Sequence, residues 1–181
     1  MTGLFDELGL NKKLLLALKE SGYTVPFPIQ EKAIPIILQG NDVIGQAHTG
    51  TGKTAAYSLP ILMKMKNARS AQALVLVPTR ELAIQVAKEM NKLAKYTETK
   101  VAAIYGGQNM RNQIIRLEKE VQIIVATPGR LIDHIRQKTV YLNSIDFVIL
   151  DEADRMLDMG FIEDINFILS IVKHKKQLCL F

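Results

Sequence analysis

Residues 42–54 read Asp-Val-Ile-Gly-Gln-Ala-His-Thr-Gly-Thr-Gly-Lys-Thr, a short apolar run that leads through a glycine-rich loop into a helical pattern. Gly50 and Gly52 allow the backbone to come close to a phosphate, and successive amide groups of such a loop can point inward as donors. The helix that follows adds a partial positive charge at its amino end. This is the P-loop pattern with Ala47 in place of the first glycine, and it predicts a nucleotide-phosphate site.

The side chains of this loop are predicted to have different roles in binding the nucleotide. We expect Lys53 to reach the β- and γ-phosphates, and the Thr54 hydroxyl to complete the shell of a magnesium ion. The other predicted nucleotide contacts are Ala47, His48, Thr49, Gly50, Thr51 and Gly52. No second histidine or cysteine lies near His48, so we interpret it as a solvated loop residue rather than as a metal ligand or acid–base group.

Short β-branched runs alternate with longer helical patterns along the chain. The runs are Asp42–Ala47, Ala73–Pro78, Val101–Gly107, Ile123–Pro128, Phe147–Asp151 and Gln177–Phe181. Runs that are apolar on both faces, separated by amphipathic helices such as 81–95, predict an α/β fold: a mostly parallel central sheet with helices on both faces. No repeat or linker divides the chain, so residues 1–181 are predicted to form a single domain. Its ligand sites should lie at the carboxyl ends of the strands.

An acidic motif, Asp151-Glu152-Ala153-Asp154, follows the apolar run at 147–150. In a P-loop enzyme an acidic residue in this place holds magnesium, largely through water, and we assign this to Asp151. The neighbouring Glu152 could orient and deprotonate the attacking water. The motif alone is weak, because helix amino ends are often acidic. About 100 residues after a P-loop and at the end of an apolar strand, it is a strong signal, and Lys53, Asp151 and Glu152 become the catalytic candidates.

Composition narrows the class of protein without deciding it. The 181 residues are 48% hydrophobic and 23% charged, which fits a soluble globular domain. The net charge of +5 makes a polyanionic partner plausible, although charge alone decides little. No apolar stretch is long enough to span a bilayer and the start lacks the order of a signal peptide, so we expect no membrane contact and a cytoplasmic location. A lone cysteine, Cys179, is consistent with a reducing compartment.

Taken together, these motifs resemble the amino-terminal P-loop NTPase (RecA-like) domain of DEAD-box ATP-dependent RNA helicases over nearly the whole chain. Residues 22–30, Gly-Tyr-Thr-Val-Pro-Phe-Pro-Ile-Gln, are similar to the Q motif of that family, which makes residues 1–31 a Q-motif region. The resemblance implies that Gln30 reads the edge of adenine and that an aromatic ring, Tyr23 or Phe5, packs on or near the base. Phe27 departs from the family pattern, which usually has a small hydroxyl residue there.

Three further motifs match the family and imply an RNA-binding surface. Their residues are Pro78, Thr79 and Arg80; Gly106 and Gly107; and Thr127, Pro128, Gly129 and Arg130. By resemblance they hold the sugar–phosphate backbone of single-stranded or duplex RNA, so binding should be largely independent of sequence and sensitive to salt. The resemblance also assigns Asp154 to a relay between the ATP and RNA sites.

The resemblance implies ATP and Mg²⁺ as cofactors and an ATP-dependent RNA helicase as the full-length protein. Members of the family continue past the position that corresponds to Phe181 into a second RecA-like lobe, whose arginines complete the ATP site. Without that lobe we expect this chain to bind nucleotide, to hydrolyse little ATP, to unwind no duplex and to bind RNA only weakly. We also expect an isolated lobe to be a monomer. Two alternatives stay open: a nucleotide-binding module without turnover of its own, and a lobe of a DNA helicase.

Overall fold

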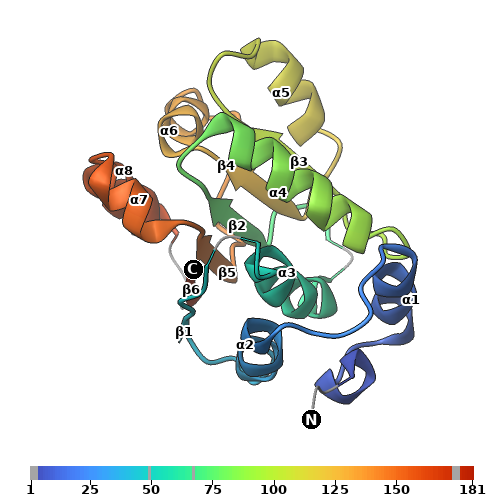
Figure 1. Cartoon of the computed structure of the whole chain (residues 1–181). Coiled ribbons are helices and arrows are strands. Elements are labelled where there is room, and N and C mark those ends of the chain that lie inside the picture. The colour runs from blue at the N-terminus through green and yellow to red at the C-terminus, as the bar shows by residue number, and fades with distance from the viewer. Residues whose placement is uncertain (1–3, 49, 67, 173–175) are drawn as a thin grey trace.

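The computed structural model describes residues 4–48, 50–66, 68–172 and 176–181. Its strands form one sheet in the order β1-β6-β5-β2-β4-β3 (Figure 1). All neighbouring strands in this sheet are parallel, so the predicted, mostly parallel sheet is fully parallel in the described part of the chain. The strands are β1 (Val43–Ile44), β2 (Ala73–Leu76), β3 (Val101–Ile104), β4 (Ile123–Ala126), β5 (Phe147–Leu150) and β6 (Gln177–Leu180).

Helices cover both faces of the sheet, as predicted. One face packs against η1 (Phe5–Leu8), α1 (Lys12–Glu20), α2 (Pro28–Leu38), α3 (Lys53–Lys64) and α4 (Arg80–Leu93). The other packs against α6 (Pro128–Arg136), α7 (Ala153–Asp158) and α8 (Ile162–Ile171). Helix α5 (Met110–Leu117) contacts the edge strand β3. In Figure 1, α6, α7 and α8 lie on the left of the sheet, and α3 and α4 lie across its right side.

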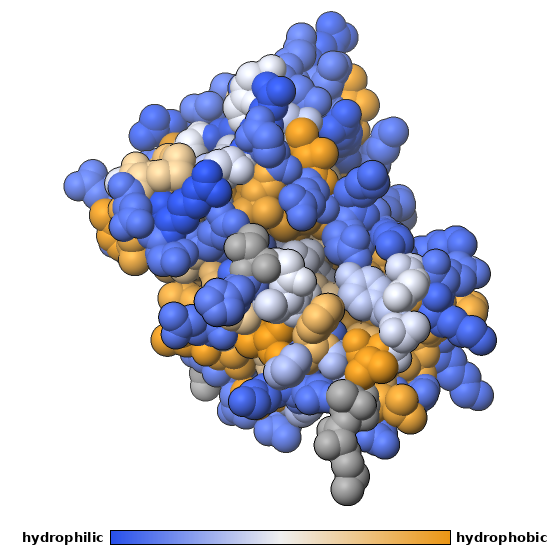
Figure 2. Space-filling model, viewed as in Figure 1, coloured by the Kyte–Doolittle hydropathy of each residue, from blue (hydrophilic) through white to orange (hydrophobic). Residues whose placement is uncertain are grey.

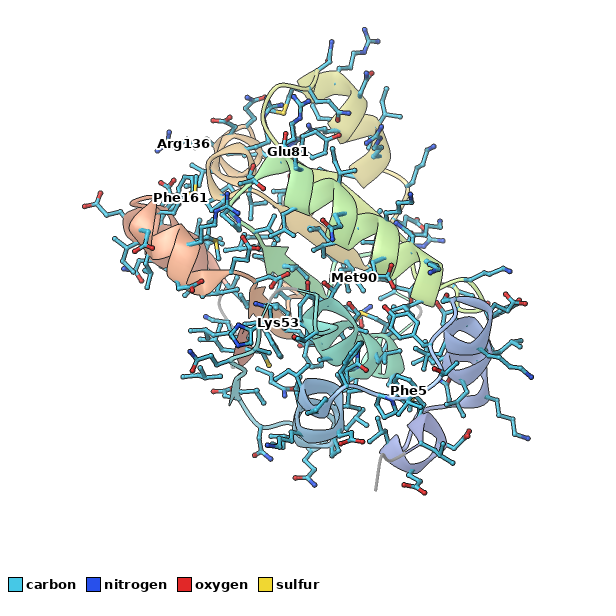
Figure 3. All side chains as sticks on the ribbon, viewed as in Figure 1. Phe5, Lys53, Glu81, Met90, Arg136 and Phe161 are labelled. Atoms are coloured by element: carbon cyan, nitrogen blue, oxygen red, sulfur yellow. The ribbon has the colours of Figure 1, made fainter. Side chains whose placement is uncertain are left out.

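Side-chain alternation along the strands separates the two hydrophobic cores. In β2, Ala73 and Val75 enter the core beneath α3 and α4, whereas Leu74 and Leu76 enter the core beneath α6 and α8. Successive strand residues point to opposite faces, so a central strand covered on both sides must be apolar throughout. The apolar stripe of α4, which includes Met90 (Figure 3), repeats every three or four residues, as a one-sided amphipathic helix requires.

The first strand is shorter than predicted. The sequence suggested residues 42–47, but β1 comprises only Val43 and Ile44 because it is an edge strand that pairs with β6 alone. Gly45 still donates its N–H to Leu180 O at 2.8 Å before the chain turns away. A Cβ atom at Gly45 would lie 2.6 Å from the Phe181 ring, so only glycine fits under that ring. No helix in the described segments is both long and apolar enough to cross a bilayer.

Candidate nucleotide site and nucleic-acid interface

The P-loop leaves β1 and ends where α3 begins at Lys53 (Figure 3). Gly50 and Gly52 have φ values of +83° and +81°, in the left-handed region that side chains with a Cβ avoid. The loop therefore needs glycine at these two positions to bring its amide groups round to the start of the helix. Within the loop, the Thr51 hydroxyl donates to His48 O at 2.6 Å. Thr49, also predicted to contact nucleotide, lies outside the described residues.

Gln30 is fully buried and joins the Q-motif region to the P-loop. Its Oε1 accepts from Phe27 N at 2.9 Å, and its Nε2 donates to Gly52 O at 3.0 Å. The first bond satisfies the N–H of Phe27, the residue before α2, which has no hydroxyl of its own to cap the helix. Phe27 itself is half-exposed, and its ring lies against Gly52. A carboxamide has two N–H groups and two acceptor lone pairs, so one of each stays free of these two bonds for an adenine edge.

Asp151 lies buried at the end of β5, beside the start of α3. Its Oδ2 accepts from the Tyr57 hydroxyl at 2.8 Å, and its Oδ1 accepts from Glu152 N at 3.1 Å. Burial raises the pKa of Asp151, while the Tyr57 hydrogen bond and the charge of Lys53 act in the opposite direction. The carboxylate thus stands next to the predicted phosphate-binding lysine.

Glu152 has an unusual backbone conformation, with φ +52° and ψ +49°, which is rare for a residue with a side chain. Strain of this kind collects at functional sites, because the surrounding structure has to hold it in place. The Glu152 carboxylate accepts from Arg155 Nη1 at 3.0 Å, one turn along α7. The predicted general base is therefore positioned by a strained backbone and an arginine.

Two cavities flank the P-loop, and Lys53 and Glu152 border both. The larger, of about 630 Å³, is also lined by Gln46, Ala47, His48, Asp154 and Arg155. The smaller, of about 260 Å³, extends past Thr54 and Asp151 to Tyr23, Gln85 and Glu89. Apart from Thr51, the described residues that were predicted for phosphate, magnesium and the attacking water line one or both of these cavities. Clefts at this edge of a parallel sheet are where α/β folds bind ligands.

The aromatic candidates for the adenine differ in their surroundings. Phe5 is buried in the core, with its ring edge-on to Tyr23 at 6.1 Å between centroids. Core packing explains Phe5 without any role in binding. Tyr23 is half-buried, borders the smaller cavity and donates its hydroxyl to Glu89 on α4 at 2.7 Å. Burial and the Glu89 carboxylate raise the pKa of the Tyr23 phenol, so it stays a neutral donor.

The predicted RNA-binding loops follow β2, β4 and β3, which are neighbours in the sheet. The P-loop and the acidic motif follow β1 and β5 in the other half of the same sheet. One edge of the sheet therefore carries a half with the predicted nucleotide site and a second half built from the three loops. In Figure 3, Glu81 at the start of α4 lies well apart from Lys53 at the start of α3. The surface over α5, at the top of Figure 2, is predominantly hydrophilic.

Side chains interlock these three loops. A Cβ atom at Gly107 would lie 3.1 Å from Arg80 Nη1, so the Arg80 guanidinium covers a residue of left-handed backbone. Arg130 donates to Gln108 O at 3.0 Å, and its side chain is only 15% exposed. Thr79 caps α4 by accepting from Leu82 N at 3.2 Å. Arg80, Gly107 and Gly129 are exposed. Arg130 is less accessible, because part of its guanidinium is hydrogen-bonded to the loop at Gln108.

A buried polar network beneath the loops was missed by sequence reasoning. His134 and Gln113 have no exposed surface, and His134 Nε2 lies 3.1 Å from Gln113 Oε1. Gln113 Nε2 donates to Tyr105 O at 2.8 Å, which leaves its Oε1 as the acceptor and places a proton on His134 Nε2. His134 Nδ1 faces Thr139 Oγ1 at 2.8 Å. Burial and the nearby Arg130 charge lower the pKa of His134. His134 lies one turn after Arg130, and that spacing was the available signal.

This combination defines a class of protein: a P-loop nucleotide-binding lobe with a RecA-like sheet and a row of loops beside the nucleotide site. A sequence model described as "DEAD/DEAH box helicase" matches residues 27–181. The chain belongs to that family.

Known proteins similar to this chain carry the same family name. It is 49% identical over 177 residues to the DEAD-box ATP-dependent RNA helicase RhpA of Helicobacter pylori and 52% identical over 178 residues to CshA of Geobacillus kaustophilus. The matches cover 98% of this chain but only 36% and 38% of those proteins. A crystal structure of a DEAD box protein from Methanococcus jannaschii superposes with a TM-score of 0.94 at 42% identity, covering 98% of this chain and 49% of that one.

Proposed function

We propose that the chain is the ATP-binding lobe of an ATP-dependent RNA helicase, which in the full-length protein couples ATP hydrolysis to RNA binding and local unwinding. One observation carries the proposal. Lys53 and Glu152 border both cavities beside the P-loop, and three interlocked loops occupy the rest of the same sheet edge. That arrangement lets one lobe touch a nucleotide and an RNA backbone at once.

The nucleotide contacts follow from the chemistry of each group. The P-loop amides and the amino end of α3 attract the phosphates, and Lys53 places a full positive charge on the β- and γ-phosphates. Glu152 accepts the proton of the attacking water, provided that its pairing with Arg155 opens. Gln30 recognises the adenine edge with its remaining donor and acceptor, and Tyr23 lies against the base from the smaller cavity.

The donors at the site fit magnesium. Mg²⁺ favours oxygen ligands and keeps several waters, and Thr54 and Asp151 offer one hydroxyl and one carboxylate within a single site. The ion, when bound, would neutralise charge on the β- and γ-phosphates. Asp151 would hold it largely through water, since the carboxylate is buried and already accepts two hydrogen bonds.

RNA would lie across the loops after β2, β3 and β4. Arg80, exposed at the start of α4, supplies charge to a phosphate, and the exposed Gly107 and Gly129 supply free approach to backbone amides. Asp154, exposed beside the larger cavity, is placed to relay the state of the nucleotide to these loops. Contacts of this kind carry little sequence information, so binding should fall steeply with salt.

Steady-state ATP hydrolysis, measured with and without single-stranded RNA beside nucleotide binding, tests the proposal. Lys53→Ala should abolish nucleotide binding, whereas Lys12→Ala, which removes an exposed lysine of α1, should leave it unchanged. Turnover by this chain alone should stay near background, because arginines from a second lobe contribute ~10³-fold or more in phosphoryl transfer. Binding that survives Lys53→Ala would overturn the phosphate assignment. RNA-stimulated turnover near about 1 s⁻¹ would overturn the need for a second lobe.

RNA rather than DNA is the proposed substrate because the relatives are named RNA helicases. A competition between RNA and DNA strands of the same sequence tests this, since only RNA offers a 2′-hydroxyl. Equal competition would favour a DNA-tolerant lobe. Gel filtration tests the proposed monomer, and cell fractionation the proposed cytoplasmic location.

A further inference from the structure

We propose that Tyr57 is a positioning residue for the magnesium site, because its buried hydroxyl donates a hydrogen bond to the Asp151 carboxylate. The inference rests on the proposed function, which assigns Thr54 and Asp151 to the metal. Nothing in the sequence motifs points to Tyr57, which follows Lys53 by one helical turn inside α3. It reaches across 94 residues of sequence to the end of β5.

The contacts are fixed by burial. Tyr57 has no exposed surface, and its hydroxyl donates to Asp151 Oδ2 at 2.8 Å. Thr54 lies three residues before Tyr57, on the same face of α3. The Tyr57 ring packs against Phe181, with 5.3 Å between ring centroids, so the phenol cannot swing away without disturbing the core.

The direction of this hydrogen bond follows from the chemistry of the two groups. An ionised carboxylate can only accept, so the single phenol proton of Tyr57 goes to Asp151.

Asp151 gains a fixed orientation from the same arrangement. One carboxylate oxygen is held by Tyr57 and the other by the N–H of Glu152, and each oxygen retains a lone pair for a magnesium-bound water. The Tyr57 hydroxyl therefore orients the carboxylate that faces the proposed magnesium site. Outer partners of metal ligands typically contribute 10–100-fold to metal affinity.

Tyr57→Phe is the direct test, since it removes the hydroxyl and keeps the ring against Phe181. The probe is ATP binding during a Mg²⁺ titration, compared with ATP binding in excess EDTA. We expect the Mg²⁺ concentration for half-maximal enhancement of ATP binding to rise about tenfold, with binding in EDTA unchanged within about twofold. Tyr105→Phe, which alters a buried tyrosine at the end of β3, is the matched control and should leave both readings unchanged.

Two further measurements separate a role in magnesium binding from a general effect on folding. Thermal unfolding without nucleotide establishes that the Tyr57→Phe protein is folded. In an Asp151→Asn background, Tyr57→Phe should have less effect on the Mg²⁺ titration, because the carboxylate that Tyr57 orients is gone. A Mg²⁺ titration of Tyr57→Phe that superimposes on the unaltered protein would overturn this inference and leave the proposed function standing. If Mg²⁺ does not enhance ATP binding by the unaltered protein, the proposed function itself is overturned.

Discussion

Gly52→Ala is predicted to destabilise the fold much more than Gly50→Ala, although both glycines belong to the P-loop. Their φ values, +81° and +83°, are nearly equal, so the backbone cost of a side chain is the same at both positions. Their surroundings differ. A Cβ atom at Gly50 meets nothing within 4 Å, whereas one at Gly52 would overlap the Gln30 amide nitrogen and lie 3.0 Å from the Phe27 ring.

The magnitudes can be worked from these contacts. Alanine in left-handed backbone costs about 1–2 kcal/mol, and Gly50→Ala should cost only that. At Gly52 the new methyl group must also displace Gln30, which breaks its bonds to Gly52 O and Phe27 N. Each such bond contributes about 1 kcal/mol, so Gly52→Ala should cost about 3–4 kcal/mol. In a domain of this size that corresponds to a fall in Tm of roughly 6–16 °C, against about 2–8 °C for Gly50→Ala.

Urea and thermal unfolding, followed by circular dichroism without nucleotide, measure both values. A Gln30→Ala background provides the decisive control, because it removes the group with which the new methyl collides. There, Gly52→Ala should cost about as much as Gly50→Ala does in the unaltered chain. Equal losses for Gly50→Ala and Gly52→Ala in the unaltered chain would contradict the reasoning, as would a Gly52→Ala loss that persists without Gln30.

Three further predictions concern the loop half of the molecule. The pKa of His134 is lowered in the folded protein, so the unfolded chain binds more protons at acidic pH. The free energy of unfolding should therefore fall as pH drops below about 6.5. Urea unfolding at pH 7.5 and 5.5 should show this dependence, and His134→Gln should flatten it. An unchanged slope would exclude His134 as the source. Gln113→Leu should lower the free energy of unfolding by about 2–3 kcal/mol, because it leaves buried polar partners unpaired. As a control, Ile115→Ala, at an exposed position of the same helix, should lower it by about 0.5 kcal/mol or less. Equal losses would contradict the network. Arg80→Ala should weaken RNA binding alike for all sequences and lower the salt slope by about 1, and Arg136→Ala, at the far end of α6, is the control.

The strands and the candidate residues of the nucleotide site could be proposed from the sequence because their signals are local. Apart from the two-residue β1, each strand is a run of four mostly apolar residues. The P-loop and the acidic motif each lie on consecutive positions of the chain. Residues such as Gly50 and Lys53 are specified by the conformation of their own backbone and by the helix that starts beside them. Such requirements act over three or four residues, so they are visible in the chain itself.

The sheet order could not be read in the same way. The last strand, β6, lies between β1 and β5, which no local pattern states. The same holds for Gln30, whose amide side chain the sequence supplies but whose bond to Gly52, 22 residues away, depends on how α2 packs against α3. Tyr57 and His134 escaped notice because the sequence does not say which polar group each one meets when buried.

The sequence by itself indicated the elements, the P-loop motif and the family of this protein. The tertiary structure alone decided which strand ends are neighbours, and with them the division of one sheet edge into a nucleotide half and a loop half. It also decided which buried polar groups are paired, from Tyr57 with Asp151 to Gln113 with His134. The physical reason is that a buried polar group must find a partner wherever packing places one, and packing is a property of the whole chain.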